Sequence, residues 1–298
     1  MRADPQYVTT LTQALAVSTQ TANNLASELS SGLRVNSISD DPSAASQSIR
    51  LNNQISRIDT FIQTAATQTS MLQITDSTLG EVVSQLTSAI SLAVQAANGT
   101  LNGSNLQAVA QQITGIRDQI LALANTSYQG RYLFAGSQGQ TKPFALNTAT
   151  LPAGVLYSGD AIAQSIETPG GQRIQITLPG TAIFGSASGA LSTINQLLAD
   201  LNSGASSSTL AADSSALTDA LHQVSAQRSV LNSSLSTIQS TGNYAQTQEA
   251  QLKTQQGTLV AADPASVATQ LKSNQIQYQA LLSVITSLQK INLFDYLH

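Results

Sequence analysis

The 298-residue sequence contains no cysteine and no tryptophan, and only 9% of its residues are charged. The absence of cysteine excludes disulfides, thiolate catalysis and cysteine-ligated metal sites. Ordinary soluble domains carry roughly 25% charged residues, so the polar surface of this chain must consist mainly of Ser, Thr, Gln and Asn. Such a surface repels itself weakly, which favours close packing among many copies.

Long hydrophobic runs are also missing. No stretch of about eighteen apolar residues occurs, which argues against membrane insertion. Residues 1–13 are polar and lack the apolar segment of a secretory signal, so export would need a route without one. The net charge of −4 and the scattered basic residues argue against nucleic-acid binding.

Side chains that could carry out chemistry are few. His222 and His298 are the two histidines, and neither has a second ligand at metal-binding spacing. The acidic pair Asp40-Asp41 is better explained as structure, with Asp41 as a helix N-cap and Pro42 as the first helical residue. No phosphate-binding loop or nucleophile motif occurs. We therefore predict that the chain is not an enzyme and needs no cofactor or metal.

Apolar residues recur at alternating spacings of three and four over most of the chain, which predicts amphipathic helices. A helix from Pro42 to Ala97 would be ~80 Å long, so it must be one rod of a coiled-coil-like bundle. Asn98-Gly99 and Asn102-Gly103 then break it. The other predicted helices cover residues 7–32, 106–123, 191–201 and 210–238, and a last one starts at Asp263-Pro264.

Between residues 129 and 190 the pattern changes, because glycine, proline and aromatic residues concentrate there. Residues 173–178 alternate between polar and apolar, as a half-buried strand does. Thr168-Pro169-Gly170-Gly171 predicts a hairpin turn back to residues 162–167. The predicted fold class is mainly α with a β insert (α+β), an elongated antiparallel coiled-coil-like bundle of N- and C-terminal helices. The expected domains are 1–128 (helical), 129–190 (inserted β domain) and 191–298 (helical).

Several polar residues interrupt the apolar seams, and such residues weaken packing but define register. The terminal helices are therefore expected to be marginally stable alone and to become ordered with partners. The interrupting residues are Ser18, Thr69, Asp76, Ser214, Arg228 and Asn274.

The ends of the chain resemble a known family. Residues 29–45, LSSGLRVNSISDDPSAA, and residues 92–100, LAVQAANGT, are similar to the flagellin family of bacterial axial proteins. Three features are closer to the hook-associated members of that family than to its filament subunits. They are the SDDP run at residues 39–42, the GRYLFAGS stretch at 130–137 followed by Pro143-Phe144, and the ending NLFDYL at 292–297.

The resemblance implies a structural adaptor of the bacterial flagellum that joins the hook to the flagellin filament. It implies a helical core built from the terminal helices, with the β domain facing outward. The implied location is extracellular, at the hook–filament junction, after type III export without a cleaved signal peptide. The implied partners are further copies in a helical ring, the neighbouring junction protein, flagellin and a flagellar export chaperone.

We expect two sets of site residues from this resemblance. The assembly interface would use Leu11, Leu15, Leu25, Leu29, Leu281, Ile285, Leu288, Phe294 and Leu297. The export chaperone would bind the C-terminal helix, about residues 264–297, through Val267, Leu271, Tyr278, Leu281 and Leu288.

Two alternatives stay open. One is a short flagellin-type filament subunit, against which the SDDP run and the 132–144 motif argue. The other is a secreted coiled-coil adhesin whose β insert binds a glycan, which would need an exposed aromatic pocket around Tyr132, Phe144 or Tyr157. Aromatic residues in so small an insert are more often its core.

Overall fold

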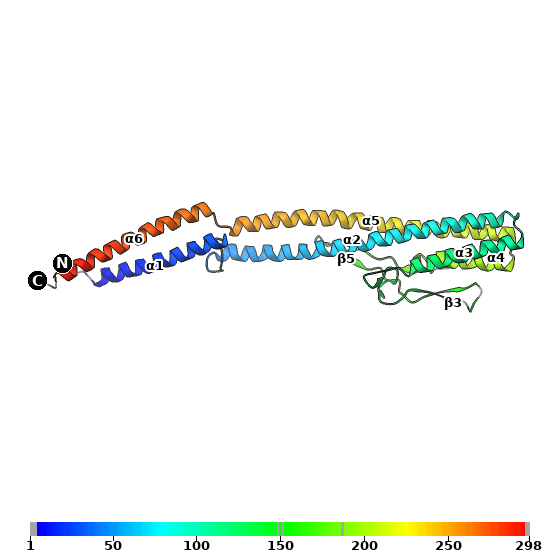
Figure 1. Cartoon of the computed structure of the whole chain (residues 1–298), viewed down its shortest axis with the longest axis horizontal. Coiled ribbons are helices and arrows are strands. Elements are labelled where there is room, and N and C mark those ends of the chain that lie inside the picture. The colour runs from blue at the N-terminus through cyan, green and yellow to red at the C-terminus, as the bar shows by residue number, and fades with distance from the viewer. Residues whose placement is uncertain (1–4, 148, 151, 186–187, 296–298) are drawn as a thin grey trace. The chain divides into compact units, whose positions relative to one another are not determined.

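The computed structural model describes residues 5–147, 149–150, 152–185 and 188–295 (Figure 1). Helices dominate the described residues, and six short strands pair as two-stranded sheets. This confirms the predicted class, mainly α with a small β insert. The helices are α1 (Pro5–Ser31), α2 (Pro42–Ala97), α3 (Gly103–Ala124), α4 (Ala190–Ser203), α5 (Ser207–Val260) and α6 (Pro264–Asp295). The strands are β1 (Ser127–Tyr128), β2 (Arg131–Tyr132), β3 (Phe144–Asn147), β4 (Gly154–Tyr157), β5 (Ser165–Glu167) and β6 (Arg173–Gln175).

The chain divides into two compact units. Unit 1 comprises Met1–Arg57 and Gln248–His298, and unit 2 comprises Ile58–Thr247. Helices α2 and α5 each contribute to both units. The division into 1–128, 129–190 and 191–298 describes order along the chain and stays a prediction.

The helix limits follow from local chemistry. Gly32 follows α1 with a left-handed φ of +70°, and its N–H donates to Glu28 O at 2.8 Å. A glycine tolerates that conformation without steric cost, which is why it stops the helix. Asn102 precedes α3, and its side chain accepts a hydrogen bond from Asn105 N at 2.9 Å. The predicted limits of α2, Pro42 and Ala97, are those observed.

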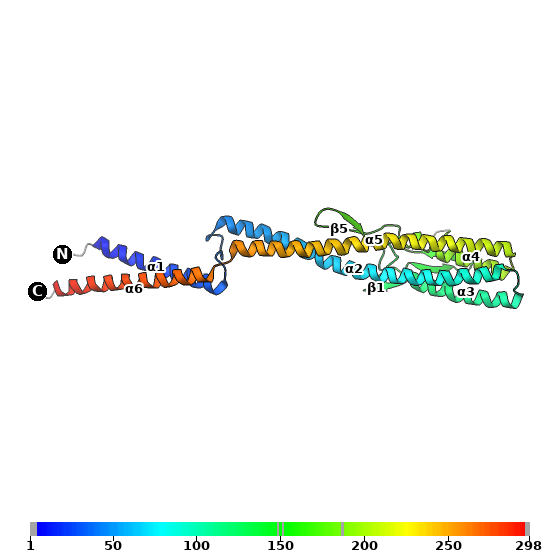
Figure 2. The same ribbon diagram turned by 90° about the horizontal axis from the view of Figure 1, so that it is seen from above.

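The core of unit 2 lies among its helices. Parts of α2 and α5 run beside α3 and α4 (Figures 1 and 2). The fully buried aliphatic side chains of this bundle include Leu72, Leu79, Leu86, Ile113, Ile120, Leu191, Ile194 and Leu197. This packing explains why long helices with little charge fold: apolar stripes from several helices cover one another.

One ion pair joins two long helices inside this unit. Arg228 of α5 donates to both carboxylate oxygens of Asp76 of α2, at 2.7 and 3.1 Å. The arginine holds the pKa of Asp76 below its ordinary value. Two residues that interrupt the predicted seam are therefore partners, which specifies the register of α2 against α5.

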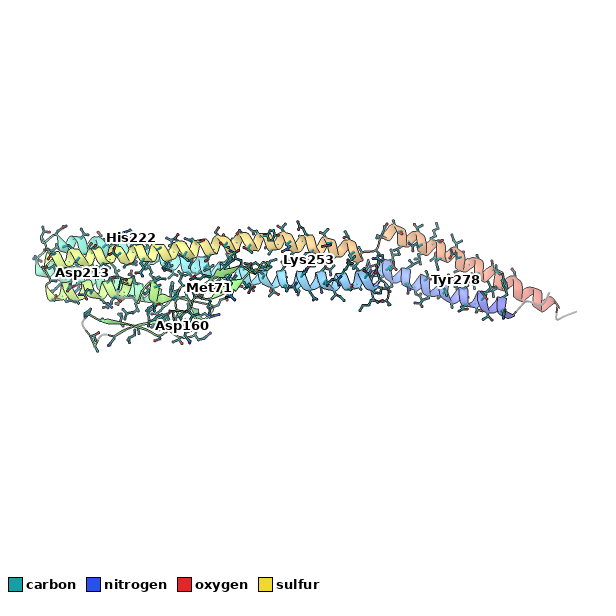
Figure 3. The ribbon with its side chains drawn as sticks, turned by 180° about the vertical axis from the view of Figure 1, so that it is seen from behind. Met71, Asp160, Asp213, His222, Lys253 and Tyr278 are labelled. Atoms are coloured by element: carbon teal, nitrogen blue, oxygen red, sulfur yellow. The ribbon has the colours of Figure 1, made fainter. Side chains whose placement is uncertain are left out.

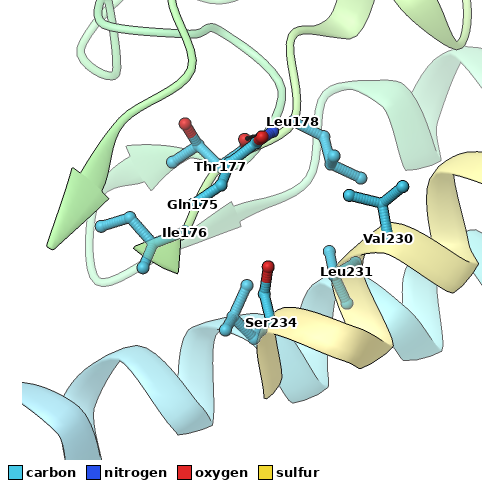
Figure 4. A pocket seen from close by; sticks show the side chains of 8 residues that line it. Gln175, Ile176, Thr177, Leu178, Val230, Leu231 and Ser234 are labelled. Atoms are coloured by element: carbon cyan, nitrogen blue, oxygen red, sulfur yellow. Dashed lines mark hydrogen bonds between the residues drawn. The ribbon is translucent and has the colours of Figure 1, made fainter. Parts of the chain in front are cut away.

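The insert and the two residues before it form three antiparallel hairpins, β1–β2, β3–β4 and β5–β6. The predicted turn at residues 168–171 joins β5 to β6, with Ile166 opposite Ile174. Beyond β6, the buried side chains of Ile176 and Leu178 lie close to Leu231 of α5 (Figure 4). These contacts attach the insert to the helices of unit 2.

An aromatic cluster forms the core of the insert. Phe134 and Phe144 each pack edge-on against Phe184, with ring centroids 5.1 and 5.4 Å apart. Tyr157 packs against Phe144 with tilted rings, and its hydroxyl lies 3.0 Å from Phe134 O and 2.7 Å from Asp160 O. Phe144 is only 1% exposed. The GRYLFAGS stretch at 130–137 and the following Pro143-Phe144 therefore have a structural role, because their phenylalanines fill the small interior of the insert.

Candidate assembly interface

The first and last helices of the chain form one pair. In both views α1 and α6 lie side by side, with the start of α1 and the end of α6 at the same end of the pair (Figures 1 and 2). Among the side chains that the structure describes, the buried ones of this pair are Ser18 and Leu25 of α1 and Val267 and Asn274 of α6. A two-helix contact of this kind stabilises weakly, since each helix covers only one stripe of the other.

A polar contact sits inside that pair. Ser18 Oγ donates to Asn274 Oδ1 at 3.2 Å, and both residues are buried. Shifting one helix along the other would leave both polar groups buried without partners, at a cost of about 1–3 kcal/mol. The two residues therefore specify a register for the α1–α6 pair, as a buried asparagine does in coiled coils.

The loop of residues 32–41 connects the α1–α6 pair to the ends of α2 and α5 within unit 1. Arg34 N donates to Val260 O at 2.8 Å, and Ala262 N donates to Gly32 O at 2.9 Å. The Arg34 guanidinium contacts Leu259 O at 3.1 Å and Asp41 Oδ2 at 3.2 Å. Residues 32–34 (Gly-Leu-Arg) belong to the flagellin-like segment 29–45. They connect the end of α1 to the residues between α5 and α6.

The two aspartates of that signature hold the loop. Asp40 accepts hydrogen bonds from Ser37 N at 2.8 Å and Asn36 N at 3.0 Å, which lower its pKa. Asp41 accepts from Ala44 N at 3.0 Å, the geometry of an N-cap, with Pro42 as the first residue of α2. This backbone bond and Arg34 lower the pKa of Asp41. Both carboxylates therefore stay ionised at neutral pH.

Apolar side chains also face outward on both helices of the pair. Val17 of α1 is 62% exposed and Ile276 of α6 is 60% exposed. Covering such side chains with a neighbouring subunit would be favourable, so they are candidates for assembly contacts. We call these residues the outer apolar set: Tyr7, Val17, Leu29, Ile276, Leu282 and Val284.

A groove of about 240 Å³ runs along the same pair. It is lined by Thr19, Ala22, Asn274, Gln275, Tyr278 and Gln279. Tyr278 lies on α6 beside α1 (Figure 3). Amide and hydroxyl groups line this groove without a charged residue, so it suits an uncharged helix surface rather than an ion.

The structure separates the expected assembly residues into different environments. Leu25 is buried between α1 and α6, so it is already used within the chain. Leu29 is exposed, and the half-buried ones are Leu11, Leu15, Leu281 and Ile285. Leu297 and the side chains of Leu288 and Phe294 lie outside the described residues. Sequence reasoning missed the outward residues Val17 and Ile276, because they lie off the heptad seam it followed.

The expected chaperone-binding residues lie along α6. Val267 is buried, whereas Leu271, Tyr278 and Leu281 are half-buried. Most of this face is thus turned toward α1 in the folded chain. A partner that used these side chains would have to take α6 before it pairs with α1.

No cluster of three metal-ligating residues occurs among the described residues, and the side chain of His222 is half-buried on α5 (Figure 3). Within the same residues, no helix combines the length and the apolarity needed to cross a membrane. Among the described residues of unit 1, the α1–α6 pair is the most extensive contact between distant parts of the chain, and we take it as the candidate site.

Comparisons with known proteins agree with this emphasis on the terminal helices. Residues 6–139 match the family model of the bacterial flagellin N-terminal helical region, and residues 215–297 match that of the C-terminal helical region. The stretch between them holds β3–β6 and α4.

Individual relatives are similar over different shares of the chain. Flagellar hook-associated protein 3 of Escherichia coli (strain K12) is 26% identical over 90% of this chain and 90% of its own length. The Salmonella typhimurium protein of that name is 36% identical over 40% of this chain and 38% of its own. A Vibrio parahaemolyticus structure described as a flagellar hook-associated protein shares the fold, with a TM-score of 0.66 and 18% identity. It is matched over 100% of its length and 74% of this chain. With both flagellin helical regions present in order along most of its length, the chain belongs to the bacterial flagellin family.

Proposed function

We propose that this chain is a structural adaptor of the bacterial flagellum that joins the hook to the flagellin filament. The observation that carries the proposal is the similarity to hook-associated protein 3 of Escherichia coli, which spans 90% of both chains. A match of that extent includes the terminal helices and the insert together. The adaptor would act by assembly rather than by catalysis, and it would reside in the flagellum outside the cell.

The α1–α6 pair is the surface we propose for assembly. Its polar register contact lets the two helices pair within the chain, while the outer apolar set stays available to neighbours. Open helical arrays need two different faces on each subunit, and a helical pair offers one on each side. The proposed neighbours are further copies of the chain in a helical ring, the adjoining junction protein and flagellin.

Assembly residues proposed on this basis combine the sequence-predicted and the exposed positions. Burying an apolar side chain that is exposed in the free chain contributes about 1.5–3 kcal/mol, so a few such residues suffice to dock a helix. Leu29, Leu281 and Ile285 stay in the proposed interface, together with Leu11 and Leu15. Leu288, Phe294 and Leu297 continue the same helix toward its end and stay proposals.

The proposal also includes export through the flagellar type III route, without a cleaved signal. Before assembly, α6 would bind an export chaperone. Because Val267 and Asn274 are buried against α1, the chaperone would hold α6 before the pair forms. Binding of the chaperone should therefore slow α1–α6 pairing. Equal chaperone affinity for the folded chain and for a chain unfolded in mild denaturant would contradict this order of events.

A substitution on the outer apolar set tests the assembly surface. Ile276→Asp adds a charge to a side chain that is 60% exposed, so the free chain should fold as before. In an interface the unpaired charge would cost several kcal/mol, and assembly should fail. The control is Ser225→Asp, which adds the same charge to an exposed position of α5 in unit 2.

The assay is growth of flagellar structures watched by electron microscopy. Wild-type protein and the control variant should cap purified hook ends and then permit flagellin to polymerise, whereas Ile276→Asp should not. Circular dichroism of all three should coincide. Normal capping by Ile276→Asp would reject this surface, and long filaments grown from the chain alone would make it a filament subunit.

The adhesin alternative receives no support from the insert. Its discriminating feature was an exposed aromatic pocket, yet Phe144 is 1% exposed and Tyr157 packs on it. Phe144 therefore belongs to the core of the insert, and Tyr132 and Tyr157 are half-buried.

A further inference from the structure

Two carboxyl groups meet where α4 faces the first turns of α5 in unit 2. Asp213 of α5 is only 8% exposed, and its Oδ2 atom is buried without a hydrogen-bond partner among the described residues (Figure 3). Asp200 of α4 is close enough for its charge to raise the pKa of Asp213. Gln196 Nε2 donates to Asp200 Oδ2 at 2.8 Å, a bond that favours the ionised form of Asp200.

Among the described residues that line the cavity beside Asp213, none is basic. Residues 152–155 and 192–196 and Ala216, which surround this cavity, include no charged residue. Within α4 the only charged residue is Asp200, and α5 carries none between its start and Asp213. Asp200 is therefore the one charged group that faces Asp213 from these elements. Two carboxylates in such a place repel each other and lack a counter-charge.

Binding of one proton would remove the repulsion between the two carboxylates and the need for a counter-charge. It removes the buried charge of Asp213, and it supplies the donor that a carboxyl–carboxylate hydrogen bond requires. Burial first, and then the charge of Asp200, raise the pKa of Asp213 to about 6. A cavity of about 350 Å³ lined by Ala153, Val155 and Asp213, among others, lets water reach the edge of the pair, so protons can exchange.

We propose that Asp213 and Asp200 form an acid-sensitive carboxyl pair that holds one proton, so that the α4–α5 contact opens more readily at neutral pH than in acid. The pair is a device of the folded bundle and does not depend on the assembly proposed above. It makes α4 and the first turns of α5 respond to a pH change over which ordinary aspartates stay ionised.

The direction of the effect follows from linkage. The folded-state pKa of Asp213 lies above the ordinary value of 3.8, so the folded chain binds the additional proton. Its stabilising effect is complete below pH 3.8 and is lost as the pH rises through about 6. Because each pKa unit changes an equilibrium tenfold, the change in local opening is bounded at roughly 100-fold.

The experiment is hydrogen exchange on the full chain between pH 4 and 8, corrected for the intrinsic rate at each pH. Amides of α4 and of the first turns of α5 should lose protection across this range in the wild type. Asp213→Asn keeps the shape of the side chain and cannot ionise, so its protection should stay constant and exceed that of the wild type at pH 7. Asp219→Asn, at an exposed position of the same helix, should behave as the wild type does.

A second measurement identifies the titrating group. The side-chain carboxyl carbon of Asp213, followed by NMR in ¹³C-aspartate-labelled protein, should titrate clearly above the exposed aspartates. Titration in the ordinary range, or an unchanged pH profile in Asp213→Asn, would overturn the proposal. Protection restored at pH 7 by added Mg²⁺ or a small diamine in the wild type alone would also overturn it, in favour of a cation site.

Discussion

At the scale of single residues, polar groups inside the helical pairs contact positions far away in the sequence. Ser18 meets Asn274, and Asp76 meets Arg228. All four residues interrupt the predicted apolar seams. Periodicity was enough to predict that such residues lie on the seams and define register. Their pairing could not be predicted, because it depends on which helices lie next to each other and at what offset.

The Asp76–Arg228 pair supports a prediction at this scale. Asp76→Asn should lower the free energy of unfolding at pH 7 by about 1 kcal/mol, a small value because both side chains are partly exposed and solvent screens them. Arg228 holds the pKa of Asp76 below 3.8, so the contribution is present above that pH and is lost as the pH falls further. Denaturant unfolding at pH 7 and at pH 3 measures both effects.

A matched control separates this ion pair from loss of charge in general. Asp118 pairs with its sequence neighbour Arg117 on α3, and its side chain is 58% exposed. Asp118→Asn should leave the free energy of unfolding nearly unchanged, since exposed pairs contribute about 0–1 kcal/mol. Equal losses in the two variants would mean that the contact between α2 and α5 has no special role.

At the scale of elements, helix limits were predictable where strong local signals exist. Asp41-Pro42 and Asn98-Gly99 bracket α2, whose observed limits are Pro42 and Ala97. For α5 the apolar seam could be followed only to Ile238, whereas the helix extends to Val260. Residues 239–260 are rich in glutamine and threonine, which leave no apolar stripe. Contacts with α2, such as Gln256 Nε2 to Ser48 Oγ at 3.2 Å, accompany the helix there.

The insert offers a prediction about one glycine. A Cβ atom at Gly180 would lie 2.5 Å from Phe134 O and 2.7 Å from the ring of Phe144. Gly180→Ala should therefore force the aromatic cluster apart and destabilise the chain by about 1–3 kcal/mol. Thermal unfolding followed by near-ultraviolet circular dichroism, which reports on the aromatic rings, would detect the loss.

Gly115 provides the comparison for that substitution. It lies within α3, and a Cβ atom there would meet no other atom within 4 Å. Gly115→Ala should raise stability by about 0.5–1 kcal/mol, because alanine loses less backbone entropy in a helix. If both alanine variants were destabilised alike, close packing around Gly180 would not be the cause.

At the scale of the whole molecule, the two units differ in how they are stabilised. Unit 2 contains fully buried leucines from several helices, such as Leu79 and Leu86. The α1–α6 pair of unit 1 buries only a few side chains, two of which are polar, and exposes others such as Val17. A chain built this way can keep unit 2 folded while the terminal helices exchange one set of partners for another.

Hydrogen exchange on the monomer tests this difference. Amides of α1 and α6 should exchange much faster than those around Leu79 and Leu86, because local opening costs least where little apolar area is buried. Protection of α1 and α6 should rise when the chain caps hook ends. Full protection of residues 5–31 in the monomer would show that the terminal helices need no partner.

Sequence alone determined the helical class, the limits of α2, the end of α1 at Gly32, the hairpin at 168–171 and the resemblance at both ends. These are local properties, set by periodicity, caps and turn residues within a few positions of one another. Only the tertiary structure decided that Leu25 is covered while Val17 and Ile276 face outward, and that Asp213 meets Asp200 away from any cation. Such outcomes depend on the rotation and offset of neighbouring helices, which packing among distant segments determines.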